Sequence, residues 1–203
     1  MKILLATHNR HKIDEIREIF ADFPIDFLSA ADVPNLPEPV EDGDTFEANA
    51  RKKATELAAS SGLWALADDS GLEVDALGGA PGVHSARYAG EPCDHARNND
   101  KLLAALADVP PEKRTARFRC VAALASPDGT VRTVSGTCPG HIATERHGAA
   151  GFGYDPLFIP EGETQTFAEL GPEIKNSMSH RGRAMAKAKA EWGDLLKSLG
   201  AHS

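Results

Sequence analysis

The chain has 203 residues and a formal net charge of −8 at pH 7. Proteins whose main task is to coat a nucleic acid backbone are usually basic, so we expect no nucleic acid partner. No stretch reaches the roughly 18 apolar residues of a membrane-spanning helix, and the start lacks a signal-peptide pattern, so we expect a cytoplasmic protein with no membrane partner.

The first third of the chain alternates apolar runs with polar segments. Residues 2–6 are a short apolar run typical of a buried strand. A helix is expected next, because apolar residues recur at helical spacing: Ile13, Ile16, Ile19 and Phe20. Residues 25–28 could form a second strand. Three prolines between residues 34 and 39 exclude regular structure, so residues 30–44 are expected to form an extended loop.

A second helix is expected to begin near Thr45 and to end at Gly62. Asp44 is a suitable N-cap, and Glu47 lies three residues further on, as a capping box requires. Glycine is common just past a helix end. Residues 64–67 then predict a buried strand that ends in the polar run DDSG.

The remaining elements follow from turn residues and periodicity. A Gly/Pro-rich loop precedes a helix at residues 94–106, and Pro127-Asp128-Gly129 predicts a hairpin between strands at 116–126 and 130–137. A Gly-rich loop at 148–155 precedes a possible strand at 156–159. The last helix is expected to begin at Ser179, with an apolar face made by Ala184, Met185, Ala188, Trp192, Leu195, Leu196 and Leu199.

These elements predict an α/β fold around a central mixed sheet. No linker with a shift in composition divides the chain, so we expect one domain over residues 1–203. This domain could have two lobes with a cleft between them. The cysteines Cys93, Cys120 and Cys138 are odd in number and form no CxxC pair. Reduced thiols are therefore expected, and no zinc site.

A polar loop between the first strand and the first helix could bind an anion. Backbone N–H groups at a helix start attract negative charge, and side chains of this loop add donors and a cation. A polar loop that only caps the helix is the alternative. The candidate residues are Thr7, His8, Asn9, Arg10, His11 and Lys12.

Acidic residues in two places could bind a divalent cation. Asp68 and Asp69 follow a buried strand, where two adjacent carboxylates repel each other and lose hydration unless a cation relieves both costs. Mg²⁺ typically takes one or two protein carboxylates. An Asx-turn at Asp68–Asp69 and a solvated loop acid at Glu41 are the structural alternatives.

Two segments in the second half of the chain could bind a flat base and a second anion or carbonyl group. Residues 151–156 combine glycines, two aromatic rings and Asp155, which could stack on a base and accept hydrogen bonds, or could plug the core. His180 and Arg181 fall in the first turn of the last helix, where positive charge opposes the helix dipole. That misfit favours an anion or a carbonyl acceptor as their partner over a basic surface helix.

Five segments occur in one order: THNRHK, EDGDTFEANARKKA, ADDSGLEVDALGGAPGVHSARYAG, AGFGYDP and KNSMSHRGRA. Together they resemble the inosine/xanthosine triphosphate pyrophosphatase family, from residue 2 to about residue 199. The resemblance implies an elongated α/β fold with two lobes around a cleft, and a homodimer. It also implies hydrolysis of non-standard purine nucleotides between the α- and β-phosphates, which keeps them out of DNA and RNA.

The resemblance also implies roles for individual residues. Glu41 and Asp69 would bind Mg²⁺, Asp69 would be the general base, and its pKa would be raised by Asp68. Substrate-binding residues would be Thr7, His8, Asn9, Arg10, His11, Lys12, Ser70, Phe152, Gly153, Tyr154, Asp155, Lys175, His180 and Arg181. Many members of the family have Gly where this chain has His8, which weakens the case for His8. Lys53 could also face the phosphates.

Donors at His180 and Arg181 would favour purines that carry a carbonyl at position 6 over adenine, which carries an amino group. Three other functions are alternatives. A pyrophosphatase for modified pyrimidines or general dNTPs would keep the metal and phosphate residues. A nucleotide-binding regulator would not need paired carboxylates. A nucleic-acid-binding module conflicts with the net charge.

Overall fold

The computed structural model describes residues 2–7 and 9–201, without the side chains of residues 11, 200 and 201. Its strands form one sheet in the order β2-β1-β3-β4-β5-β6. β1 (Lys2–Leu5) is parallel to β2 (Asp26–Ser29) and β3 (Trp64–Val74), whereas β5 (Val131–Ile142) is antiparallel to β6 (Phe158–Pro160). The sheet is therefore mixed, and with its helices it confirms the predicted α/β fold.

Two compact units divide the chain. Unit 1 comprises Met1–Asp69, Cys120–Gly136 and Ala184–Ser203, and unit 2 comprises Ser70–Arg119 and Thr137–Arg183. The strands β3, β4 (Thr115–Ala125) and β5 each contribute residues to both units. The prediction of a cleft between two lobes stays a prediction.

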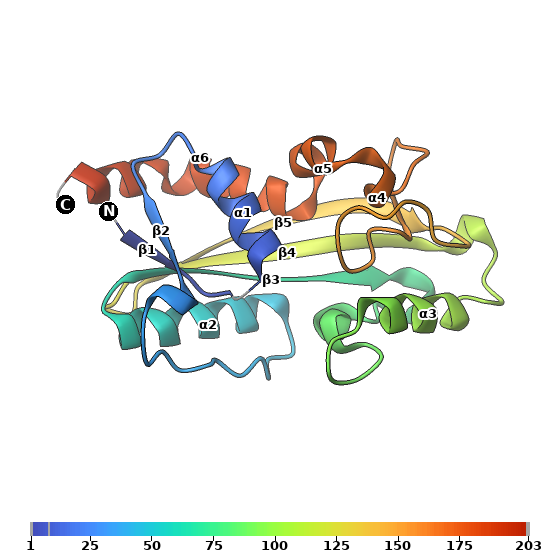
Figure 1. Cartoon of the computed structure of the whole chain (residues 1–203), viewed down its shortest axis with the longest axis horizontal. Coiled ribbons are helices and arrows are strands. Elements are labelled where there is room, and N and C mark those ends of the chain that lie inside the picture. The colour runs from blue at the N-terminus through green and yellow to red at the C-terminus, as the bar shows by residue number, and fades with distance from the viewer. Residues whose placement is uncertain (1, 8, 202–203) are drawn as a thin grey trace. The chain divides into compact units, whose positions relative to one another are not determined.

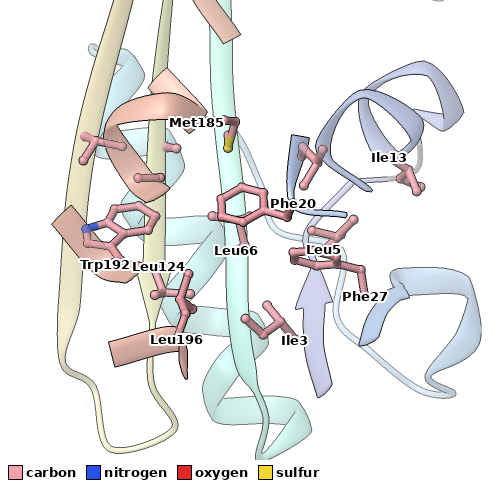
Figure 2. Close-up of a cluster of buried hydrophobic side chains, with 14 residues drawn as sticks. Ile3, Leu5, Ile13, Phe20, Phe27, Leu66, Leu124, Met185, Trp192 and Leu196 are labelled. Carbon is pink, nitrogen blue, oxygen red and sulfur yellow. The ribbon is translucent and has the colours of Figure 1, made fainter. Parts of the chain in front are cut away.

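In unit 1, helices pack on both faces of the sheet. α1 (Arg10–Ile19) and the unit 1 part of α6 (His180–Ala201) lie on one side, and α2 (Phe46–Ser61) lies on the other (Figure 1). Figure 2 shows the core between α1, α6 and the sheet, with Phe20 and Phe27 among its side chains. The Phe20 ring makes edge-to-face contacts with Phe27 and with Phe23. Each fully buried Leu, Ile or Phe side chain stabilises the fold by roughly 1.5–3 kcal/mol.

Unit 2 has its own aromatic core. The Phe118 ring centroid lies 4.7 Å from that of Phe158 and 6.2 Å from that of Phe167. Around this core the chain forms α3 (His95–Ala105), α4 (Phe167–Leu170) and α5 (Pro172–Met178). The described residues of the two units also form four short 3-10 helices. These are η1 (Ala30–Asp32), η2 (Asp75–Leu77), η3 (Gly82–Arg87) and η4 (Pro111–Lys113).

Several predicted helix ends and turns are confirmed. Asp94 caps α3 by accepting from Arg97 N at 3.0 Å, and Ser179 Oγ accepts from Gly182 N at 3.0 Å at the start of α6. Gly62 ends α2 in the left-handed conformation, with a φ of 69°. The hairpin between β4 and β5 turns at residues 127–129, and β5 runs five residues beyond its expected end.

Two expectations about the acidic segments were wrong. The N-cap of α2 is Thr45, whose side chain accepts from Ala48 N at 3.1 Å, and Glu47 pairs with Arg51 instead of closing a capping box. The strand that was expected to end at residue 67 continues as β3 to Val74, so Asp68 and Asp69 lie within a strand. No Asx-turn forms there. None of the described helices combines the length and apolarity required to cross a membrane.

Candidate active site

A buried lysine of α2 lies at the centre of the acidic residues of unit 1. Lys53 is 7% exposed, and its Nζ donates to Glu41 Oε1 at 2.6 Å and to the backbone carbonyl of Asp68 at 2.7 Å. Burying an ammonium without partners would cost several kcal/mol, so these acceptors are required for its position. Lys53 therefore links the Glu41 loop to β3, and its expected contact with the phosphates stays a prediction.

The electrostatics of Lys53 show how closely the acids surround it. Burial alone would lower the pKa of Lys53, but the negative charges of Glu41, Asp68 and Asp69 together outweigh burial and raise it. Lys53 consequently remains a cation throughout the physiological range. Three carboxylates act on one ammonium, so the acidic residues that the sequence singled out do gather in one place.

A second lysine reaches this cluster from the first helix. Lys12 Nζ lies 3.0 Å from Asp68 Oδ2, and the Asp68 side chain is 1% exposed. Asn9 caps the same helix, because its Oδ1 accepts from Lys12 N at 3.4 Å, and Asn9 N donates to Thr7 Oγ1 at 3.2 Å. The turn before α1 thus positions Lys12 against β3. Arg10 is exposed at the start of α1.

Asp69 is held by an amide from α2. Asn49 Nδ2 donates to Asp69 Oδ2 at 2.9 Å, and Asn49 is 1% exposed. Burial is the main reason that the pKa of Asp69 is raised above its usual value, and the charge of Glu41 adds to this effect. The predicted direction is confirmed, but burial is the main cause, where the sequence had suggested Asp68. A carboxylate with a raised pKa is a better proton acceptor.

Unit 2 brings together a different set of the predicted residues. Lys175 Nζ lies 2.8 Å from Asp155 Oδ2, and the same carboxylate oxygen accepts from Phe152 N at 2.9 Å. The Lys175 Nζ is also 4.4 Å from the centroid of the Phe152 ring, a cation–π distance. Gly151 has a φ of +78°, and a Cβ there would lie 2.1 Å from Asp155 Oδ2, so only glycine fits.

The two basic residues at the start of α6 are both buried. The His180 ring stacks on Phe118 with a centroid separation of 4.8 Å and an interplanar angle of 13°. Arg181 is 2% exposed, and its guanidinium carbon lies 6.0 Å from the Phe152 ring centroid. The reading of a basic surface helix is therefore wrong for these two residues. Arg181, Lys175 and Phe152 form one group around an aromatic ring.

The remaining predicted residues have different surroundings. Tyr154 is 4% exposed, packs in the aromatic core of unit 2 and donates from its hydroxyl to the Ser85 carbonyl at 2.8 Å. Its side chain therefore has a structural role. Gly153 accepts at its carbonyl from Asn99 Nδ2 at 3.0 Å, and Ser70 is half-buried in β3 directly after Asp69. His8 and the His11 side chain lie outside the described residues.

Sequence reasoning missed Asn49 and Asn99. A usable signal existed for Asn49, because Asn49 and Lys53 lie four residues apart on the face of α2 that also buries Ala50, Ala54 and Leu57. Polar side chains on an apolar helix face need buried partners. The sequence could not reveal which partners these were, since Asp69 and Glu41 come from other elements.

The sequence matches a known protein family over most of its length. The model of the Ham1 family matches residues 3–191. The chain belongs to the Ham1 family. A solved Ham1 protein from Coxiella burnetii superposes on this Ham1 chain with a TM-score of 0.88 and 40% identity, over 96% of this chain and 99% of the other. The Staphylococcus aureus Ham1 protein gives a TM-score of 0.85 and 38% identity, over 94% and 97% of the two chains.

Curated relatives of this Ham1 chain are similar over almost their full length. A dITP/XTP pyrophosphatase of Desulforamulus reducens is 54% identical over 188 residues, which cover 93% of this chain and 94% of the relative. A dITP/XTP pyrophosphatase of Geobacter sulfurreducens is 52% identical over 192 residues, which cover 95% and 96% of the two chains. The resemblance identified from the five sequence segments is therefore confirmed.

Proposed function

We propose that this chain hydrolyses non-standard purine nucleoside triphosphates, dITP and XTP among them, to the monophosphate and pyrophosphate, with Mg²⁺ as cofactor. The chain is a hydrolase of the nucleoside triphosphate pyrophosphatase type. The observation that carries the proposal is a charged cluster in unit 1, in which the buried Asp68, Asp69 and Lys53 meet the half-buried Glu41 and Lys12. The names of the close relatives support the choice of substrates.

The residues of this cluster fit a magnesium ion. Carboxylate oxygens are the ligands that Mg²⁺ prefers, and the charge of Glu41 acts on Asp69, as expected of two carboxylates that share one cation. Within the described residues, no three His, Cys, Asp or Glu side chains form a group that could hold a metal alone. Mg²⁺ typically takes one or two protein carboxylates and completes its shell with water and substrate phosphates.

The chain's own residues then have separate tasks. Glu41 and Asp69 hold the metal, which offsets the negative charge of the phosphates when bound. The ammonium groups of Lys12 and Lys53 bind phosphate oxygens, together with the backbone and side chains of Thr7 and Asn9. Asp69 accepts the proton of the attacking water as its oxygen bonds to the α-phosphorus and the bond to the leaving pyrophosphate breaks.

Recognition of the base falls to unit 2 in this proposal. Phe152 stacks on the purine, and Lys175 and Arg181 present donors around the same ring. Inosine and xanthosine carry a carbonyl at position 6 that accepts such hydrogen bonds, whereas adenosine carries an amino donor. A site built on hydrogen bonds can discriminate by roughly 10⁴ between the two kinds of base. His180 supports this group through its stack on Phe118.

The test is release of pyrophosphate from ITP, dITP, XTP, GTP and ATP, with and without Mg²⁺. We expect turnover of the first three only with the metal, and little turnover of ATP. Comparable rates on ATP and ITP would contradict the base-recognition model. Preference for a modified pyrimidine triphosphate in the same assay would favour the alternative pyrophosphatase. Nucleotide binding without any product would favour a regulator.

The cellular setting belongs to the same proposal. An enzyme of this kind acts on the free nucleotide pool, which places it in the cytoplasm and keeps deaminated purines out of DNA and RNA. A homodimer is implied by the resemblance of the sequence to its family. Sedimentation velocity at several protein concentrations measures the assembly state, and a sedimentation coefficient of one chain at all concentrations would exclude the dimer.

A further inference from the structure

One buried side chain of α2 connects the two acidic segments of unit 1. Asn49 Oδ1 accepts from the backbone N of Gly43 at 2.8 Å, and Asn49 Nδ2 donates to Asp69 Oδ2 at 2.9 Å. Gly43 belongs to the loop that carries Glu41, and Asp69 lies in β3. A single amide therefore bridges the loop of one proposed metal ligand and the carboxylate of the other.

The orientation of this amide is determined by its two partners. A backbone N–H can only donate, so the end of Asn49 that faces Gly43 must be the carbonyl oxygen. The opposite end is then the NH₂ group, which is the only end that can donate to a carboxylate. Reversing the amide would place a donor against the N–H of Gly43 and an acceptor against Asp69.

The contact with Gly43 is too close for any other residue at position 43. A Cβ on Gly43 would lie 2.7 Å from Asn49 Oδ1 and 2.9 Å from the Ala48 Cβ. The loop backbone thus rests directly on the first turns of α2, and the glycine permits this approach. Because Asn49 is 1% exposed, water has little access to compete for either hydrogen bond.

These contacts restrict Asp69 in a way that the ion pairs of the cluster do not. An ammonium such as Lys53 attracts a carboxylate from many directions, since it is a point charge with three rotatable donors. An amide N–H fixes one oxygen of the carboxylate along one direction. Asn49 therefore sets the rotation of the Asp69 side chain relative to the Glu41 loop.

We propose that Asn49 is a positioning residue for the hydrolytic reaction, which holds the Asp69 carboxylate and the Glu41 loop in the mutual geometry needed to share one Mg²⁺. The inference rests on the proposed function, because it concerns the same metal and the same general base. Asn49 touches neither the metal nor the nucleotide in this scheme, and it acts only through Asp69 and the Gly43 backbone.

The test combines metal binding with a double-mutant cycle. Electron paramagnetic resonance with Mn²⁺ as the probe measures the affinity of the protein without nucleotide, and dITP turnover measures kcat and KM. We expect Asn49→Ala to weaken Mn²⁺ binding and to lower kcat, each by about tenfold, with KM for dITP changed less than threefold. In the Asp69→Asn background, the same Asn49→Ala change should lower kcat much less, because the carboxylate that Asn49 orients is already lost.

Two further variants separate positioning from stability. Thr45→Ala removes the N-cap of the same helix, so it should lower the melting temperature while Mn²⁺ affinity and kcat stay within twofold of the wild type. Asn49→Asp preserves the volume and the acceptor for Gly43 N but replaces the donor to Asp69 by an anion. It should lower kcat at least tenfold, and it serves as the test if Asn49→Ala fails to fold.

The outcomes distinguish the two levels of the proposal. If the wild type releases pyrophosphate from dITP but Asn49→Ala keeps both its Mn²⁺ affinity and its kcat, the positioning role is wrong and the proposed function stands. Additive losses in the double variant, or equal losses in Thr45→Ala, would also overturn the positioning role. If the wild type releases no pyrophosphate from any purine triphosphate, the proposed function itself fails.

Discussion

The ammonium of Lys12 lies 3.0 Å from Asp68 Oδ2, and the Asp68 side chain is almost completely buried. Lys12, which is proposed to bind phosphate, therefore also neutralises Asp68, the neighbour of the proposed general base Asp69. Lys53 is related in the same way to Glu41, at 2.6 Å. A divalent cation that binds Glu41 must compete with Lys53, and the positive charge of Lys12 lies on the residue next to the other proposed ligand, Asp69.

Replacement of Lys12 should therefore separate metal binding from catalysis. In Lys12→Met, the lost positive charge leaves the acids more negative, so Mn²⁺ should bind about tenfold more tightly, which corresponds to about 1.4 kcal/mol. Turnover of dITP should fall at least about a hundredfold, because a positive group that stabilises the phosphates is lost. Mn²⁺ binding by paramagnetic resonance and pyrophosphate release measure the two effects.

A matched control lies one residue before Lys53. Lys52 pairs with Asp42 at 2.6 Å, but both side chains are substantially exposed, so Lys52→Met makes the same change in net charge outside the cluster. Surface pairs contribute about 0–1 kcal/mol, so this variant should bind Mn²⁺ and turn over dITP like the wild type. Equal behaviour of the two methionine variants would show that net charge, and not the Lys12–Asp68 pair, governs metal binding.

Asp69→Asn tests the general base directly. The asparagine keeps the shape of the side chain and can still accept from Asn49 Nδ2, but it cannot take a proton from water. We expect kcat for dITP to fall at least about a hundredfold, at the lower end for a positioned base, while the circular dichroism spectrum stays that of the wild type. Asp42→Asn, in the exposed acidic loop, is the control. A near-normal kcat would remove Asp69 from this role.

The contrast between Asp69 and Gly62 explains how far sequence reasoning reached. Gly62, Asp94 and Ser179 act through neighbours three or four residues away, so local rules predicted the helix boundaries that they set. The strand was expected to end at the run DDSG, and the two adjacent carboxylates there were expected to need a cation. In the protein Lys12, Lys53 and Asn49 offset that cost, and all three come from helices, far beyond the three or four residues over which local rules act.

The sequence predicted the main residues of the candidate site but not the side chains that hold them in place. Motif order located Glu41, Asp69, Phe152 and Lys175, and the structure does gather the members of each set within its unit. The side chains that hold them were harder to find. Asn49 is one polar residue among many until its partners are known. Helices α4 and α5 were not predicted, although Pro172 is a residue well suited to the first position of a helix.

Stability should depend on pH through Asp69. Burial raises the pKa of Asp69 above its unfolded value of 3.8, so the protonated form is favoured in the folded protein. This contribution to stability is complete below the unfolded pKa and is lost as the pH rises through the folded pKa. Without added metal, Asp69→Asn should therefore melt at a higher temperature than the wild type at pH 7, and the difference should vanish near pH 3.5. Thermal melts between pH 3.5 and 8 measure this.

The sign of the difference in melting temperature between Asp69→Asn and the wild type at pH 7 tests the direction of the Asp69 pKa. Asp42→Asn is the control, because the pKa of Asp42 is lowered by its hydrogen bond with Lys52, so the ionised form is the favoured one in the folded state. That variant should gain no stability at pH 7. If Asp69→Asn is less stable than the wild type at pH 7, then Lys53 and Asn49 favour the ionised carboxylate more than burial opposes it, and the expected direction of the Asp69 pKa is wrong.

Removing one partner of the Lys175–Asp155 ion pair in unit 2 should destabilise the folded protein. Lys175 and Asp155 are both buried, at 7% and 4% side-chain exposure, so Lys175→Met removes one partner of a buried ion pair. Such a change costs about 3–5 kcal/mol, which lowers the melting temperature by about 2–4 °C per kcal/mol in a chain of this size. Adding Asp155→Asn should recover most of the loss, since asparagine can still accept from Phe152 N without a charge.

Activity should not recover together with stability. The double variant lacks the ammonium that lies against the Phe152 ring, so discrimination between dITP and dATP should stay reduced at least about tenfold although the protein is folded. Arg146→Met, which breaks an exposed pair with Asp100 in the same unit, should change the melting temperature by only a degree or two. Full recovery of discrimination in the double variant would mean that Lys175 serves only to hold Asp155, and base recognition would then rest on Phe152 and Arg181.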